Sequence, residues 1–244
     1  MFTYTHFIWL AIAALIIALM LILSKNFSLS LKTVLTIMCV VSFLSEVTKI
    51  LLNMEDGING GKVLEPGSLP FHLCSIQIFF IFGLRFFIKN ENTKQILYNF
   101  MVPTSIVGAI ISLFIPTIGT SFLKVQVYQY FIYHAFLIFF GIYLIREKHV
   151  KFNVKTLLTN YALLIMLMFL NLWVNSFLSF EGTNFMYLTR PPMKNLPILN
   201  LDHGWYVYFI SLFTIAVVLM GAFQLPFILI NRSKTKKAIQ ESNE

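Results

Sequence analysis

Two side chains that could act as nucleophile and base stand inside apolar stretches of this sequence. Cys74 lies in the segment Leu-Pro-Phe-His-Leu-Cys-Ser-Ile-Gln at 69–77, and His134 lies within the apolar run 122–145. A thiol attacks as its thiolate, and a nearby histidine can take the thiol proton. We therefore interpret Cys74 as a candidate catalytic nucleophile and His134 as its candidate general base, in chemistry such as acyl transfer.

His72 is nearer to Cys74 in the sequence, but it is not the expected base. Two residues on an α-helix are about 200° apart, so His72 and Cys74 would point in nearly opposite directions. The pairing with His134 has its own difficulty. At about 1.5 Å per residue, Cys74 would lie about 7–8 Å and His134 about 18 Å from the same membrane surface. Helix tilt and uncertain helix boundaries can absorb most of that difference.

Further polar side chains stand where they could surround this pair. Glu46 and Lys49 are three residues apart on one helical face and can form an ion pair. Ionisable groups within membrane spans usually face a protein interior or a water-filled cavity, and amides can donate to a developing oxyanion. The predicted substrate-binding residues are Glu46, Lys49, His72, Gln77, Tyr130, Asn171, Asn175 and His203.

Each of these residues also has a structural interpretation, which the sequence leaves open. Asn171 and Asn175 could simply hydrogen-bond neighbouring helices, and Cys74 could be a small buried packing residue. His72, His134 and His203 could meet as three ligands of a catalytic zinc. Because no spacing signature supports such a centre, we predict neither a metal nor another cofactor.

The elements that must position these residues are transmembrane helices. The 244-residue chain is 58% hydrophobic and 11% charged, whereas soluble domains contain about 25% charged residues. Apolar runs of about 20 residues can cross a bilayer. Seven such runs are predicted at 4–23, 31–53, 69–88, 95–115, 122–145, 155–178 and 203–230. The expected fold class is therefore all-α, a single seven-helix membrane domain over 1–231 with a polar, frayed tail at 232–244.

Loop charges predict the orientation of this bundle. Most of the 18 Lys and Arg residues fall after the first, third, fifth and seventh runs, as in the cluster between 146 and 155. The positive-inside rule places those segments in the cytoplasm, with the N-terminus outside and the C-terminus inside. The candidate polar residues then gather in the outer half of the membrane, while the inner halves look nearly all apolar. The net charge of +8 is explained by these loops, and no nucleic-acid motif accompanies it.

Three blocks of the sequence resemble a known family. The Leu-Pro-Phe-His-Leu-Cys-Ser-Ile block at 69–76, the run around His134 and the Asn-Phe-Met-Tyr-Leu block at 184–188 resemble the YwaF-like integral membrane proteins of bacteria. A related animal membrane protein is an acyltransferase that builds polyunsaturated ether phospholipids, and a cysteine and a downstream histidine are its proposed residues. Cys74 and His134 match that order and separation. The resemblance implies a phospholipid acyltransferase or transacylase, with Arg190 as a further headgroup contact.

The sequence therefore favours a multi-pass protein of the bacterial plasma membrane that acts on membrane phospholipids through an acyl-cysteine. Two alternatives stay open: a transporter or channel for a small solute, and a structural membrane protein without chemistry of its own. A transporter predicts a polar track that reaches the cytoplasmic side. A structural protein predicts that Cys74 and His134 face different neighbours. The substrate and the oligomeric state are not encoded in any pattern of this sequence.

Overall fold

Seven α-helices account for most of the chain. A computed structural model describes residues 2–56, 61–193, 196 and 198–241. Six of its helices are long and apolar enough to cross a membrane. These six are α1 (Tyr4–Asn26), α2 (Leu31–Leu52), α4 (Glu91–Phe114), α5 (Val125–Arg146), α6 (Val154–Phe177) and α7 (Trp205–Glu241). The all-α class and the membrane-spanning character predicted from hydropathy are confirmed.

The predicted third span differs from the other six. Residues 69–72 are not helical, and α3 (Leu73–Phe82) begins only after them, with His72 as its N-cap. A five-residue π-helix, η2 (Gly83–Phe87), continues α3, so the two together are only about 22 Å long. Pro70 disfavours a helical conformation at Leu69, the first residue of the predicted span. Six of the seven expected spans are long helices, whereas the third is a shorter apolar helix over Leu73–Phe87.

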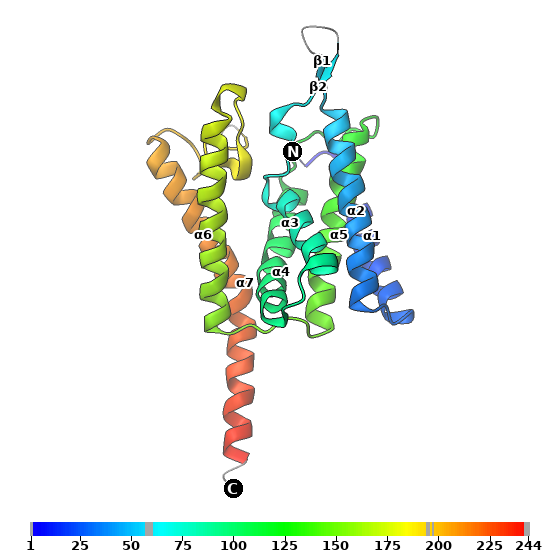
Figure 1. The fold of residues 1–244 in the computed structure, drawn as a ribbon, viewed down its shortest axis with the longest axis vertical. Helices are drawn as coiled ribbons and strands as arrows, with labels where there is room; N and C mark the ends of the chain where they lie inside the picture. Colours follow the sequence, from blue (N-terminus) through cyan, green and yellow to red (C-terminus); the bar gives the residue numbers. More distant parts are fainter. Residues whose placement is uncertain (1, 57–60, 194–195, 197, 242–244) are drawn as a thin grey trace.

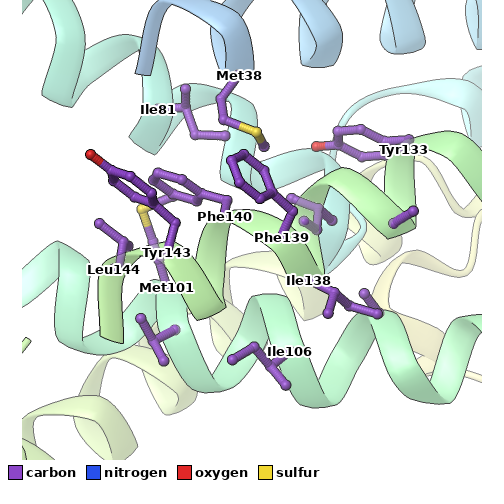
Figure 2. Packing of buried hydrophobic residues seen from close by; sticks show 14 of the residues in the cluster. Met38, Ile81, Met101, Ile106, Tyr133, Ile138, Phe139, Phe140, Tyr143 and Leu144 are labelled. Atoms are coloured by element: carbon purple, nitrogen blue, oxygen red, sulfur yellow. The ribbon is translucent and has the colours of Figure 1, made fainter. Parts of the chain in front are cut away.

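Helix α5 lies at the centre of the larger hydrophobic core. It packs against α1, α2 and α4, and its buried face is rich in aromatic residues. Figure 2 shows Phe139, Phe140 and Tyr143 of α5 among Met38 of α2 and Met101 of α4. Close approach of α4 and α5 requires Gly141, since a Cβ there would lie 2.5 Å from the Ile106 side chain.

A second, smaller core joins α6 and α7 to the rest of the bundle. Its buried members include Phe100 of α4, Leu164 and Met168 of α6, and Met220 of α7. Buried amides reinforce the same boundary: Asn160 donates to the Asn99 carbonyl at 3.0 Å and to Gln224 at 2.9 Å. These amides lie toward the end of the bundle where α4 and α6 begin, so the expectation that this half is nearly all apolar was wrong.

The connections on one side of the bundle are the elaborate ones. The segments 53–72, 115–124 and 178–204 meet at this side, which we call the loop end (Figure 1). The first of them carries a hairpin of β1 (Glu55–Asp56) and β2 (Lys62–Val63), and the last contains the short 3-10 helix η4 (Phe185–Tyr187). At the opposite end α7 extends past the other helices (Figure 1). The backbone is helical to Glu241, so the expected frayed tail is helical for most of its length.

Candidate functional site

A cavity of about 450 Å³ opens among α2, α3, α4, α5, α6 and α7 near the loop end. Its lining includes both members of the predicted catalytic pair, Cys74 and His134. Of the predicted substrate-binding residues, those that also line it are Glu46, Lys49, His72 and Tyr130. Residues far apart in the sequence are thus brought to one chamber, as the clustering of polar groups at one end of the spans predicted.

Cys74 occupies the first turn of α3. Because the first helical hydrogen bond runs from the Ile76 amide to the His72 carbonyl at 2.8 Å, the amides before Ile76 have no partner within the helix. The late start of α3 therefore leaves the Cys74 and Ser75 amides as backbone donors in the first turn of the helix, where they can stabilise negative charge.

The tautomer of His134 is fixed by its hydrogen bond to the backbone. Its Nδ1–H donates to the Tyr130 carbonyl at 2.7 Å, and since a carbonyl oxygen only accepts, Nδ1 carries the proton. Nε2 of the neutral ring is then a bare acceptor. That atom is buried and has no hydrogen-bond partner, while the side chain lines the cavity. The Tyr130 ring lies 4.3 Å from the imidazole, centroid to centroid, and fixes it further.

Tyr133 connects the two candidates. Its hydroxyl donates to the Cys74 carbonyl at 2.9 Å, so the first turn of α3 lies beside the turn of α5 that contains His134. The first turn of α3 follows the non-helical residues 69–72. Tyr133 carried no signal in the sequence, because a tyrosine in an apolar run is usually a packing residue.

The loop end of the cavity is polar. Lys49 and Glu46 form the ion pair that their spacing predicts, and Lys49 Nζ also donates to Ser75 at 3.1 Å. Gln126 donates to Asn53, and Gln129 donates to Ser45 at 2.6 Å. This rim offers one ammonium, one carboxylate and several neutral polar groups, and its ammonium contacts the residue that follows Cys74.

Asn171 and Asn175 hold a loop and do not line the cavity. Asn175 donates to the Phe185 carbonyl at 3.0 Å and accepts from the Phe185 amide at 2.8 Å. Asn171 donates to the Leu167 carbonyl at 2.9 Å and to the Met186 sulfur at 3.2 Å. Both asparagines thus anchor residues 184–190, which we call the cap. The structural interpretation of this pair fits their contacts better than the role of oxyanion donors.

The cap closes one side of the cavity with an unusual backbone. Met186 and Tyr187, both lining residues, have left-handed φ values of 53° and 56°, which non-glycine residues adopt at a cost. Tyr208 donates its hydroxyl to the Tyr187 carbonyl, and Trp205 donates to the Leu188 carbonyl at 2.9 Å. Burial raises the pKa of the Tyr187 hydroxyl, so this group is protonated at neutral pH. The block at 184–188 noted in the sequence forms most of this cap.

Three more predicted residues lie outside the lining. Gln77 is buried and bonded to the Thr104 hydroxyl at 2.9 Å and the Ser105 hydroxyl at 3.0 Å, both on α4. Arg190 donates to the Gly182 carbonyl and so braces the cap. His203 is exposed at the start of α7. In the part of the chain described by the structure, no three His, Cys, Asp or Glu side chains gather as a metal site.

The wall that α6 and α7 contribute to the cavity is apolar. It consists of Leu164, Met168, Leu212 and Ala216. The buried amides Asn99, Asn160 and Gln224 do not belong to the lining. Among the residues that the structure describes, the cavity therefore does not extend as far as these amides. The cavity thus combines a charged rim, a thiol, a histidine and an apolar wall. This combination suits an amphipathic substrate.

Comparison with known proteins gives one match. The model of the TMEM164 family matches residues 1–223, which covers every cavity-lining residue. No curated protein and no solved structure matches the chain.

Proposed function

This chain belongs to the TMEM164 family, and from the chemistry of its cavity we propose that it transfers acyl chains between membrane phospholipids through a thioester on Cys74. One observation carries the proposal. The thiol, in the first turn of α3, shares a cavity with a buried histidine whose Nε2 has no partner. A buried nitrogen without a hydrogen bond is costly to a fold, and a role in proton transfer accounts for it.

The first half of the reaction loads the enzyme. His134 Nε2 takes the proton of the Cys74 thiol, and the sulfur attacks the ester carbonyl of a phospholipid. The amides of Cys74 and Ser75 stabilise the negative charge on the tetrahedral oxygen. The ester C–O bond then breaks, and the leaving alkoxide takes the proton from His134, so that a lysophospholipid departs and the acyl group remains on sulfur.

The second half reverses these steps with a different alcohol. The hydroxyl of a lysophospholipid gives its proton to His134 Nε2 and attacks the thioester carbonyl. A new C–O bond forms, the C–S bond breaks, and the Cys74 sulfur recovers the proton. No external oxidant, reductant or activated donor is needed, because one ester replaces another.

The polar rim supplies headgroup recognition in this proposal. A phospholipid phosphate is anionic, and Lys49 Nζ lies 3.1 Å from the hydroxyl of Ser75, next to the nucleophile. Glu46 keeps the ammonium oriented when no lipid is bound. Arg190 and His203, which lie outside the lining, have no part in binding the reacting ester. The resemblance to YwaF-like proteins and the acyltransferase related to them agrees with this assignment of Cys74 and His134.

The test measures acyl transfer in the purified full-length protein. Mixed micelles would contain a phospholipid with a deuterated palmitoyl chain and an unlabelled lysophospholipid, and mass spectrometry would follow both the exchanged lipid and the acylated protein. Cys74→Ala should abolish both signals. Cys39→Ala is the matched control, since Cys39 is the other free thiol and lies buried in the larger core.

His134→Gln should slow transfer by about 100-fold or more, the usual contribution of a general base, while the protein stays folded. Transfer at the normal rate in Cys74→Ala would refute the proposal. So would an acyl group that maps to Cys39.

A further inference from the structure

We propose that a second cavity, at the end of the bundle opposite the loop end, binds the phosphate group of a phosphate monoester. The site is separate from the thiol and does not depend on the reaction assigned to Cys74. Three features of the structure support it: the charges around the cavity, the backbone at Lys148 and the buried residue Tyr98.

The second cavity has a volume of about 340 Å³. It lies where α2 and α4 begin and α5 ends (Figure 1). Its lining consists of Leu31, one face of Glu91–Tyr98 at the start of α4, and Lys148 and His149 in the connection between α5 and α6. Gln95 ties that connection to α4, because its Nε2 donates to the His149 carbonyl at 2.9 Å. The walls of the cavity are therefore held together by the protein itself.

The surroundings of this cavity are strongly positive. The segments 24–32, 88–94 and 146–155, which meet at this end, contain eight Lys and Arg residues and two glutamates. Two of the lysines, Lys94 and Lys148, line the cavity. Glu91 also lines it and pairs with Lys94 at 2.7 Å, but the Glu91 side chain is 83% exposed, so water can solvate it when Lys94 contacts an anion. Basic pockets between membrane helices bind anionic headgroups in this way.

Lys148 occupies a backbone position that usually belongs to glycine. At the end of α5 the Lys148 amide donates to the Ile145 carbonyl at 3.0 Å, and the His149 amide donates to the Leu144 carbonyl at 2.9 Å. In this pattern the first of the two donors is left-handed and most often glycine. Lys148 has a φ of 57°, which costs more for a residue with a Cβ. Its ammonium pairs with no carboxylate among the residues that the structure describes. A ligand that needs this charge accounts for the lysine.

Tyr98 is the buried polar residue of the cavity. It lies about 10 Å from the start of α4, at about 1.5 Å per residue, and is 7% exposed. A buried tyrosine hydroxyl usually has a hydrogen-bond partner. No residue in the described part of the chain is such a partner for Tyr98, although Tyr98 lines the cavity. The His149 ring lies beside it, 6.2 Å away between centroids. The Tyr98 hydroxyl is thus a donor available to a ligand.

The groups around this cavity match the chemistry of a phosphate monoester. Two ammonium groups and a phenol hydroxyl are hydrogen-bond donors. A phosphate monoester carries a charge of about −1.5 to −2 at neutral pH and has three strong acceptor oxygens, whereas a diester carries a single charge. Because membrane-spanning helices begin and end here, the cavity lies at the level of lipid headgroups. The monoester can therefore belong to a lipid, such as phosphatidic acid, or to a solute.

The test measures binding to the full-length protein in dodecyl maltoside micelles by isothermal titration calorimetry, in buffer without phosphate. The probes are dioctanoylphosphatidic acid, dioctanoylphosphatidylglycerol and inorganic phosphate. We expect phosphatidic acid to bind about 10-fold more tightly than phosphatidylglycerol, the diester, through its additional charge-assisted hydrogen bond. If inorganic phosphate also binds, the result supports a site for the phosphate group alone. If it does not, binding of phosphatidic acid supports a lipid site.

Lys148→Asn should weaken the binding of phosphatidic acid about 10-fold, because asparagine tolerates the left-handed backbone but carries no charge. Lys151→Asn is the matched control, since Lys151 belongs to the same connection and lies outside the lining. Tyr98→Phe removes one hydroxyl and should also weaken binding about 10-fold, the loss expected for a hydrogen bond to a charged group. Thermal unfolding checks that each variant is folded.

Three results would overturn the phosphate site. The first is equal loss of affinity in Lys148→Asn and Lys151→Asn, which would indicate a general attraction to the positive end of the bundle. The second is equal affinity for phosphatidic acid and phosphatidylglycerol. The third is an unchanged affinity in Tyr98→Phe.

Discussion

Replacing Asn175 with leucine should release the cap from α6. The Asn175 side chain makes two hydrogen bonds, at 3.0 and 2.8 Å, to the carbonyl and amide of Phe185, a residue with no exposed surface. Leucine is similar in size, so the main loss is polar. Each buried group left without a partner costs about 1–3 kcal/mol, whereas hydrogen bonds measured within membranes are worth about 0.6–1.7 kcal/mol. We expect the free energy of unfolding to fall by about 3 kcal/mol.

Asn171→Leu is the matched comparison, one helical turn away. The Asn171 amide donates to the Leu167 carbonyl and to the Met186 sulfur, but its Oδ1 is buried without a partner. The variant loses these two hydrogen bonds but also removes a buried oxygen that has no partner. Because the two effects offset each other, the free energy of unfolding should change by less than about 1 kcal/mol. SDS titration of both variants in mixed micelles, followed by tryptophan fluorescence, measures the difference. Equal destabilisation would show that Asn175 does not anchor the cap in the way described.

Three further predictions concern the ion pair, the helix packing and the loop opposite the cavity. Lys49→Met should destabilise the protein by about 2–4 kcal/mol, because Glu46 is then left largely buried and unpaired. Adding Glu46→Gln should restore most of that loss in the same SDS titration, and strictly additive effects would argue against the pair. Gly141→Ala should destabilise the protein by about 1–3 kcal/mol through overpacking against Ile106, which thermal unfolding in detergent would detect as a lower Tm; an unchanged Tm would contradict the close α4–α5 contact. Burial lowers the pKa of His149, so the unfolded chain binds more protons than the folded one as the pH falls through about 6.5. Stability should therefore decrease on acidification below that pH, and His149→Gln should make the decrease smaller.

Hydropathy predicted the fold class and six of the helices because a long apolar run has few ways to satisfy its backbone in a bilayer. Hydropathy failed at residues 69–72, which it assigned to the third span. Several side chains of this segment suit a membrane, but its backbone is not helical. Composition alone carries no signal for that difference. Pro70 was the one local indication, since the residue before a proline disfavours the helix.

The candidate site was predicted in part. Cys74 and His134 do line one cavity, because each is a polar group within an apolar run and the interior of the bundle is where such groups gather. The roles of the asparagines were harder to predict. Asn171 and Asn175 share a face with the expected spacing, yet they bond to a loop whose path the sequence does not reveal. Tyr133 was missed because a tyrosine in an apolar run is usually a packing residue.

The division of the bundle into two cores has a consequence for how the protein is made. The thiol, the histidine and the charged rim all come from α2, α3 and α5, which pack into the larger core with α1 and α4. Leu164, Met168, Leu212 and Ala216 come from the last two helices. A nascent chain that has been inserted only as far as Arg146 therefore contains Cys74, His134, Glu46 and Lys49 but neither this wall nor the cap. The cavity is complete only after α6, the cap and α7 have been added.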